Sequence, residues 1–338
     1  MNRRRTTPVL IDLGRPSLAL CLIVAACTGQ TFDAGSDIPH GLLAVDERNP
    51  VILTNDNQGD NWQGLYAVLF ANAGGPPLAG IIVNATSFWP DINANLSGWK
   101  NMVSAARASG LRNLPDPIAS PGSALVRPSN GAIDATVPNR SAGALLIVET
   151  SARLALPNRP LAVVTGGPLT DVADAYLIDQ TVTDRVVIVS VLGAGSSKGG
   201  SMGGPNGPMD PWADWIVAQR FKYVQVSAYY DQTSDIPASQ LSNLPQNTFG
   251  KFIAAQQPNL IDQVTASDQI GILAVGLPKF VTAVEKVSLD PSAVFDASDG
   301  PALIPDKNGK LSLVTSSDGA AASTRLWQML QDPMTFSQ

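Results

Sequence analysis

Residues 51–62 read Val-Ile-Leu-Thr-Asn-Asp-Asn-Gln-Gly-Asp-Asn-Trp, and this stretch decides the fold. A short apolar run leads directly into oxygen-bearing side chains and then into a segment whose apolar residues recur at helical spacing. The pattern predicts a buried strand, a polar loop and a helix. Asp56, Asp60 and Asn61 fall where a parallel strand would end, the edge at which open α/β sheets bind ligands. Their oxygens suit a hard cation such as calcium or magnesium, although a helix-capping loop also uses Asp and Asn.

Four later apolar runs predict further strands of the same sheet, at residues 78–83, 161–164, 185–192 and 223–228. Helical segments are expected between them, at 96–109 and 142–156 among others, whereas 111–140 is Pro-, Ser- and Asn-rich and is predicted to be a long surface excursion. Continuous apolar runs separated by helices indicate a parallel sheet covered on both faces. The expected fold is α/β, a Rossmann-like open, mostly parallel sheet. From about residue 290 onward, only a closing helix is predicted.

Composition narrows the functions that this chain can have. Its 338 residues carry a formal net charge of -6, which argues against a nucleic-acid-binding surface with its usual basic stripe. The chain has a single histidine, His40, so mechanisms that need a His base or a His-rich zinc site are disfavoured. Carboxylates, amides and a hard metal remain. The length and the 44% hydrophobic content allow one large α/β domain, which we expect over residues 49–338.

The first 27 residues are expected to be a signal peptide. Arg3-Arg4-Arg5 gives a basic start, an apolar run covers residues 18–26, and small residues precede Cys27. The Val-Ala-Ala-Cys ending resembles a bacterial lipobox, in which the Cys is lipidated and begins the mature protein; a plain signal peptide cut nearby is the alternative. Polar residues 28–48 are predicted to be a tether. We therefore expect an exported protein, either membrane-anchored through a lipid or free in the periplasm or outside the cell.

Two loops after predicted strands carry motifs. The first reads Thr-Gly-Gly-Pro-Leu-Thr-Asp over residues 165–171, where two glycines permit a close backbone approach and Thr170 or Asp171 is expected to cap the next helix. The second reads Asn-Gly-Pro-Met-Asp-Pro over residues 206–211. Each motif alone is weak evidence, but their order after an acidic strand-to-helix loop is specific.

With these motifs in this order, residues from about 50 to 280 resemble the inosine/uridine-preferring nucleoside hydrolases. That family has D-x-D-x-G-x-D-D after its first strand, then G-P-L-T-N, then N-x-x-x-D-P, and a late H-D pair. The counterparts in this chain are Thr54–Asn61, Gly167–Asp171, Asn206–Pro211 and Ser267-Asp268. The resemblance implies the nucleoside hydrolase fold and hydrolysis of an N-ribosidic bond.

The resemblance also implies a calcium site assembled from loop ends. The metal ligands would be Asp56, Asn61, the backbone carbonyl of Gly166, and Asp268. Asp56 would also act as the base toward the attacking water. Asp60 and Asn206 would contact the ribose. Calcium accepts 6–8 oxygens in flexible geometry and lowers the pKa of a bound water, which is consistent with such a mechanism.

Several positions depart from the family pattern. Thr54 stands where the loop has its first Asp, and Asn61 where it has a ligand Asp. Ser267 replaces the His that protonates the leaving base in many members, and Gly204 stands where a Glu often contacts the sugar. Some members without the His activate a purine by aromatic stacking, a role for which Trp89 is the candidate; a packing role for this loop aromatic is the alternative.

The leading hypothesis is a calcium-dependent hydrolase of nucleosides or related ribosyl compounds. One alternative is a binding lipoprotein on the same fold without turnover, because the His and two loop carboxylates are replaced. A minor alternative is a SurE-type nucleotidase, since Ile52-Leu-Thr-Asn-Asp56 is similar to the start of that family. The expected partner is a small nucleoside or ribosyl substrate, with no nucleic acid and with a membrane only through the lipid anchor; the sequence leaves open a homo-oligomer.

Overall fold

A computed structural model describes the following residues of the chain: 43, 45–56, 61–87, 89–191, 196–197, 209–226, 238–255, 269–297 and 301–336. All of them belong to one compact unit, Gly35–Gln338. The predicted signal peptide, residues 1–27, lies outside the described residues, as does most of the predicted tether. Across the described helices, none combines the length and the apolarity that a bilayer crossing requires.

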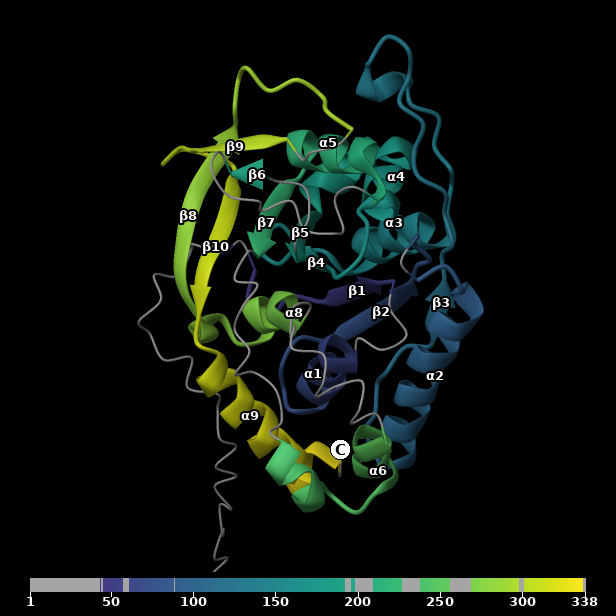
Figure 1. Ribbon diagram of the computed structural model, residues 1–338, viewed down its shortest axis with the longest axis vertical. Helices are drawn as coiled ribbons and strands as arrows, with labels where there is room; N and C mark the ends of the chain where they lie inside the picture. The colour runs from purple at the N-terminus through teal and green to yellow at the C-terminus, as the bar shows by residue number, and fades with distance from the viewer. Residues whose placement is uncertain are drawn as a thin grey trace, which may run out of the picture. The chain divides into compact units, whose positions relative to one another are not determined.

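The described strands form one sheet of ten strands in the order β3-β2-β1-β4-β5-β7-β10-β8-β9-β6 (Figure 1). Neighbours from β3 to β10 are all parallel, whereas β8 pairs antiparallel with both β10 and β9, and β6 pairs parallel with β9. The expected mostly parallel α/β sheet is therefore confirmed. The strands are β1 Val51–Asn55, β2 Leu78–Val83, β3 Pro117–Ala119, β4 Leu161–Thr165, β5 Val186–Val191, β6 Ser196–Ser197, β7 Lys222–Val226, β8 Val281–Leu289, β9 Ala302–Pro305 and β10 Leu311–Ser317.

Helices cover both faces of the sheet (Figure 1). The core on one face packs under α1 Asn61–Asn72, α2 Ile92–Ala108, α8 Gln269–Gly276 and α9 Gly319–Gln331. The core on the other face packs under α3 Ala142–Leu154, α4 Thr170–Ile178 and α5 Pro211–Arg220. The remaining helices are α6 Thr248–Ala255 and the 3-10 turns η1 Ile133–Ala135, η2 Gln180–Asp184, η4 Ala238–Asn243, η5 Pro278–Phe280 and η6 Pro333–Phe336.

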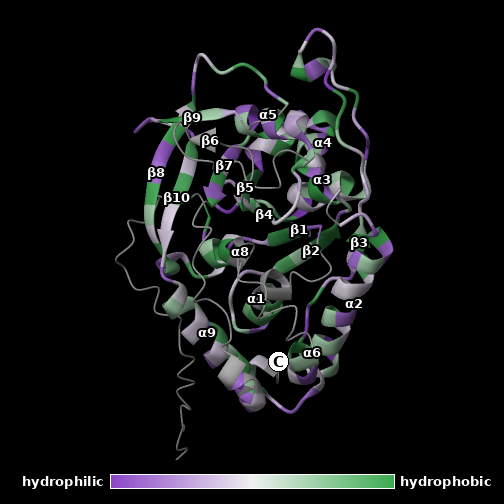
Figure 2. Ribbon diagram, viewed as in Figure 1, coloured by the Kyte–Doolittle hydropathy of each residue, from purple (hydrophilic) through white to green (hydrophobic). Residues whose placement is uncertain are grey.

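Strand β1 shows why the opening apolar run decides the fold. Successive side chains of a strand point to opposite faces, so both faces of a fully covered strand must be apolar. All residues of β1 are buried, with Leu53 in one core and Ile52 in the other. In Figure 2 much of β1 and β2 has the green of hydrophobic residues. Five strands expected from apolar runs, β1, β2, β4, β5 and β7, are present with ends within two residues of the expected ones.

The antiparallel end of the sheet departs from the expectation. The chain after residue 290 holds strands β9 and β10 before the closing helix α9, whose N-cap is Asp318. Strand β8 is buried at Val281 and Val287, and its other residues, which include Glu285 and Lys286, are exposed or partly exposed. Its mixed composition hid it from a search for continuous apolar runs.

The excursion at residues 111–140 is largely irregular, as expected, but it contains the short edge strand β3 and the turn η1. It packs back onto the second core. The Nε1 of Trp212 donates to Thr136 Oγ1 at 2.9 Å, and the Tyr176 hydroxyl donates to Asp134 Oδ1 at 2.9 Å. Trp212, 2% exposed, is thus a packing residue, as its position in the helix suggested.

Candidate functional site

Asp56 lies at the carboxyl end of β1, where the loops after β1, β2 and β4 meet. Its side chain is buried, and the Thr86 hydroxyl, on the loop after β2, donates to Asp56 Oδ2 at 2.6 Å. From the loop after β4, the Gly166 N–H donates to the carbonyl oxygen of Thr54 at 2.8 Å. The loop after β2 therefore contacts the Asp56 carboxylate, and the loop after β4 is bonded to the backbone of β1 two residues before it.

Gly167 makes this close approach sterically feasible. A Cβ on Gly167 would lie 3.1 Å from the backbone nitrogen of Asp56 and 3.4 Å from its Cβ. The contact with the nitrogen is tighter than most real Cβ contacts, so a larger residue would press on the end of β1. Gly167 thus serves the close backbone approach that the sequence indicated.

A cavity of about 330 Å³ lies beside this carboxylate. Its volume falls within the range of small-molecule sites, about 300–1,000 Å³. Its lining comes from the loop after β2, the start of the excursion, the loop after β4, and Met209: Ala85, Thr86, Ser87, Pro90, Pro121, Gly122, Ser123, Ala124, Pro168, Thr170 and Met209. The cavity is open and partly polar, and Thr86 links it to Asp56.

Trp89 belongs to the loop that contacts Asp56. Its N–H donates to Thr86 Oγ1 at 3.2 Å, and its carbonyl oxygen accepts from the Asn95 side chain at 2.9 Å. These bonds fix the loop backbone, and the side chain of Trp89 is half-buried. The structure thus places Trp89 at the same sheet edge as Asp56.

A buried polar network lies directly behind the site. The Thr54 hydroxyl donates to Asn84 Oδ1 at 3.0 Å, and Asn84 Nδ2 donates to Asp171 Oδ2 at 2.7 Å. The Ser120 hydroxyl donates to Asp171 Oδ1 at 2.7 Å and accepts from the Gly143 N–H. The network therefore joins the ends of β1, β2 and β3 to the first turns of α3 and α4.

Asp171 is the one carboxylate in this network. Burial raises its pKa, while the hydrogen bonds from Ser120 and Asn84 act in the opposite direction. Thr54 and Asp171 are joined through Asn84.

The prediction that Thr170 or Asp171 caps helix α4 is wrong. Helix α4 begins at Thr170, and its N-cap is Leu169, which makes no side-chain capping bond. Thr170 instead donates to Asp210 Oδ2 at 2.7 Å, and Asp171 serves the network described above. Both side chains have stronger polar partners on other loops, which overrides the local preference for capping.

Asp210 connects several elements next to the cavity through its hydrogen bonds. It caps α5 through the Ala213 N–H and also accepts from the Leu125 N–H at 2.9 Å, so it ties α5 to the excursion and to α4. Burial raises its pKa, an effect that these hydrogen bonds oppose. One turn later, Asp214 is 1% exposed, and within the described part of the chain neither of its oxygens has a hydrogen-bond partner. Burial and the charge of Asp210 raise the pKa of Asp214 well above its usual value.

Several expected site residues are not placed. Asp60, Asn206 and Asp268 lie outside the described residues, as do Gly204 and Ser267, and Asn61 begins α1 with its side chain not described. Helix α8, which begins at Gln269, packs on the sheet close to the site. A Cβ on its Gly271 would lie 2.9 Å from side-chain carbons of both Val164 in β4 and Val191 in β5.

Among the residues that the structure describes, no group of three His, Cys, Asp or Glu is arranged to hold a metal ion. Of the expected metal ligands, the structure describes the Asp56 side chain and the backbone of Gly166. Oxygen donors of this kind are those that hard cations take.

Sequence reasoning missed Thr86, which donates to Asp56, and it missed Asn84 and Ser120 of the network behind the site. None of the three belongs to a motif, but Asn84 and Ser120 directly follow the last residues of β2 and β3. A polar residue straight after an apolar run at the ligand-binding edge is a signal that could have identified them.

Comparison with known proteins supports the fold alone. No protein-family model matches the chain, and no curated protein matches its sequence. Solved structures do match it. An inosine-guanosine nucleoside hydrolase is 19% identical with a TM-score of 0.59, over 83% of this chain and 99% of that one. The inosine-uridine preferring nucleoside hydrolase from Bacillus anthracis is 14% identical with a TM-score of 0.57, over 82% and 98% of the two chains.

A purine-preferring ribonucleoside hydrolase from Gardnerella vaginalis is 16% identical with a TM-score of 0.55, over 84% of this chain and 97% of that one. The chain therefore has the fold of the nucleoside hydrolases over almost the full length of these proteins, as the resemblance in its sequence implied.

Proposed function

We propose that this chain, which has the nucleoside hydrolase fold, hydrolyses the N-ribosidic bond of nucleosides or related ribosyl compounds. One observation carries the proposal: the buried carboxylate of Asp56 is held at the end of β1 between Thr86 and Gly167, beside a cavity sized for a small molecule. The neighbouring structures with this fold act on inosine, guanosine, uridine or purine nucleosides according to their names.

Asp56 is the proposed base toward the attacking water. The 2.6 Å bond from the Thr86 hydroxyl to Asp56 Oδ2 fixes the orientation of the carboxyl group. A base must lie within hydrogen-bond reach of the proton that it takes, so this fixed orientation serves the reaction directly. The ribosyl–base bond then breaks through an oxocarbenium-like state, without a covalent intermediate.

The donor chemistry at this edge fits calcium. Asp56 and the Gly166 carbonyl would hold the ion together with Asn61 and Asp268, all through oxygen atoms. Support for Asp268 comes from α8, whose Gly271 packs against β4 next to the Gly166 loop. When bound, calcium would lower the pKa of a water and orient the sugar hydroxyls. Thr54 and Asn61 in place of carboxylates should make the affinity lower than in a fully acidic loop.

The substrate contacts are proposed for Asp60 and Asn206 on the ribose and for Trp89 on the base. The single histidine, His40, is far from the late H-D position in sequence, so the leaving base needs another form of activation. The Trp89 loop is pinned by Thr86 and Asn95, which would hold an aromatic platform in place.

The test is release of free base and reducing ribose from inosine, adenosine and uridine, with and without a calcium chelator. We expect hydrolysis by the wild type, and a loss of at least about 100-fold for Asp56→Asn, in the range that a general base contributes. Asp116→Asn, an exposed site on the excursion, is the matched control. Unchanged turnover in Asp56→Asn would exclude the mechanism. Nucleoside binding without turnover would favour the binding-protein alternative, and phosphate release from nucleotides would favour the nucleotidase.

A further inference from the structure

A second groove, of about 730 Å³, lies at the opposite edge of the sheet from Asp56. It is formed where β5, β7 and β10 begin and β8 ends, beside the turn η2 and the end of α5. Its charged lining residues are Asp184, Arg220, Lys222, Lys286 and Lys310. Four of these five are cationic, so the lining of the groove is positively charged, whereas the chain as a whole has a formal net charge of -6.

Strand register places the three lysines on one face of the sheet. Lys222 alternates with Val224, and Lys310 with Ser312, so both share the face that carries α1, α8 and α9. Ser312 is the register partner of Lys286, and Lys286 Nζ donates to Ser312 Oγ at 2.8 Å. Because β7 and β10 are adjacent and parallel, the lysines at their starts are neighbours. Three ammonium groups from three strands thus border one groove.

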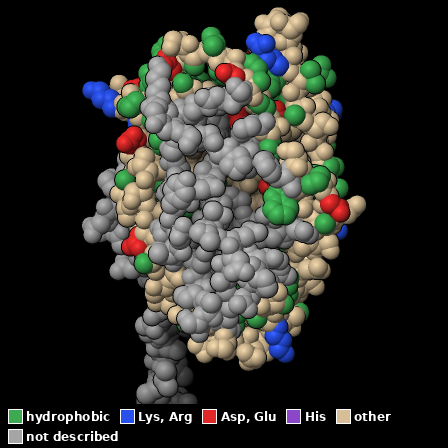
Figure 3. Space-filling model, viewed as in Figure 1, with side chains coloured by type: hydrophobic (Ala, Val, Ile, Leu, Met, Phe, Trp, Pro, Cys, Tyr) green, Lys and Arg blue, Asp and Glu red, His purple; other side chains and the backbone are tan. Residues whose placement is uncertain are grey.

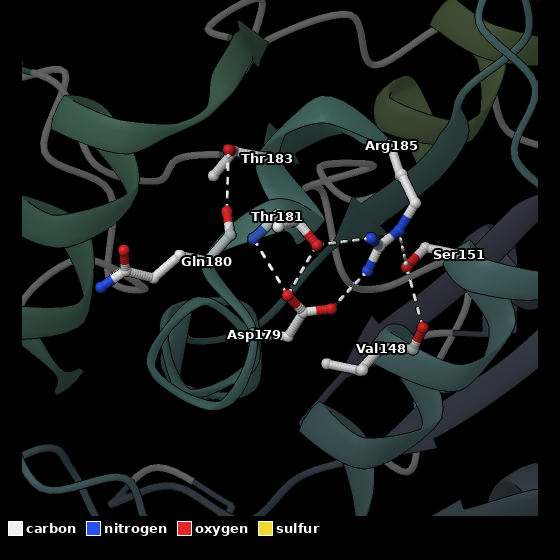
Figure 4. Close-up of polar contacts among 7 residues, drawn as sticks. All are labelled: Val148, Ser151, Asp179, Gln180, Thr181, Thr183 and Arg185. Carbon is white, nitrogen blue, oxygen red and sulfur yellow. Dashed lines mark hydrogen bonds and ion pairs between the residues drawn. The ribbon is translucent and has the colours of Figure 1, made fainter.

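The other cations nearby are already paired. Arg220 lies 3.8 Å from Asp134 and stacks over the ring of Tyr176. Arg185, next to Asp184, donates to Asp179 Oδ2 at 2.7 Å, and the close-up in Figure 4 shows its guanidinium turned toward Asp179, Thr181 and Ser151. These arginines are therefore committed to structural ion pairs.

The lysines differ, because within the described part of the chain none of the three has a carboxylate within ion-pairing distance. Asp184 is the one acidic residue of the lining. Asp306, close by on the β9–β10 turn, accepts from the Ser288 hydroxyl and the Asn308 N–H. Burial lowers the pKa of Lys286, whose Nζ donates to the Ser312 hydroxyl. Lys222 and Lys310 are exposed and can move toward a ligand.

We infer that this groove binds a small phosphorylated molecule, with the phosphate held by Lys222, Lys286 and Lys310. Lysine binds phosphate as a point charge, without the planar geometry that favours Arg for carboxylates. The volume suits a ligand of nucleotide size, and Val187 and Val224 on the same face offer an apolar floor for the rest of it. The site is separate from Asp56 and does not depend on the proposed hydrolysis.

The test is calorimetric titration with three ligands. AMP is the phosphorylated ligand, adenosine is the matched ligand without the phosphate, and inorganic pyrophosphate is the probe without the nucleoside. The variants are Lys222→Gln/Lys286→Gln/Lys310→Gln, and Lys222→Gln/Lys310→Gln, which alters only exposed lysines. Lys100→Gln/Lys251→Gln, at exposed positions of α2 and α6, is the control.

We expect the dissociation constants of AMP and pyrophosphate to rise at least about tenfold in the triple variant and severalfold in the double variant, with strong salt dependence. They should not change in the control, and adenosine binding should be the same in all four proteins. Equal AMP affinity of the triple variant and the wild type, or no binding of either phosphate to the wild type, would overturn the inference. Because adenosine reports on the Asp56 site, failure of one site is distinguishable from failure of the other.

Discussion

Replacement of Asp171 tests whether the buried network holds the candidate site together. Its two carboxylate oxygens accept bonds of 2.7 Å from Asn84 and from Ser120. A hydrogen bond to a charged group is worth about 1.5–3 kcal/mol, so Asp171→Ala removes about 3–6 kcal/mol of interaction. Two effects reduce that sum. The variant no longer buries a carboxylate, whose raised pKa records the cost of burial, and Asn84 Nδ2 keeps a 3.1 Å bond to the Ser120 carbonyl.

The expected net loss for Asp171→Ala is therefore about 2–4 kcal/mol in the free energy of unfolding. Asp171→Asn keeps the size and one acceptor oxygen but turns an amide N–H₂ toward one of the two donors, so about 1–2 kcal/mol is expected. The assay is urea unfolding at neutral pH followed by far-UV circular dichroism, with a common slope for all variants.

Asp116→Ala is the control, because Asp116 is exposed and pairs only with Arg107 at the surface. A change below about 1 kcal/mol is expected there. A loss in Asp171→Ala no larger than that of the control would refute the assignment of Asp171 as the hub of the network.

Three further results are expected. Gly167→Ala should lower turnover about tenfold by pushing on Asp56, because small misplacements of catalytic groups are costly, whereas the exposed Asp116→Asn should not; turnover of Gly167→Ala equal to that of the wild type would contradict the close-approach argument. Thr86→Val should cut turnover with a stability change of about 1 kcal/mol, since one hydrogen bond to the carboxylate is lost; full activity would count against the orienting role of Thr86. Asp214→Asn should be as stable as the wild type below pH 3.8 and increasingly more stable than the wild type as the pH rises. The reason is that the pKa of Asp214 is higher in the folded than in the unfolded state, which lowers the stability of the wild type above the unfolded-state pKa. A constant difference between the urea midpoints of the two proteins across pH would refute this.

The central sheet and the position of Asp56 could be predicted from sequence because both depend on patterns among residues that are neighbours in the sequence. Strands buried on both faces leave continuous apolar runs, and a polar residue at the end of such a run marks the ligand-binding edge. Asp56 after Val51–Asn55 satisfies both conditions.

The polar network could not be predicted because its members lie far apart in the sequence. Thr54, Asn84, Ser120 and Asp171 come from four separate segments and meet only after the sheet order is fixed. The capping prediction for Asp171 failed for the same reason: a distant partner outcompeted the nearest backbone. Strand β8 was missed because a strand with one solvated face mixes charged and apolar residues.

On the face drawn in Figure 3, the described Lys and Arg side chains lie at the margins of the view.

Calcium titration calorimetry on wild type and Asp56→Asn tests the central claim most directly, namely that oxygens from separate sheet-edge loops bind one divalent ion at Asp56. The account predicts one calcium site in the wild type, an affinity lower by at least about tenfold in Asp56→Asn, since ligand charge sets calcium affinity, and no change in Asp116→Asn. Calcium binding that is as tight in Asp56→Asn as in the wild type, or absent from the wild type, would contradict it.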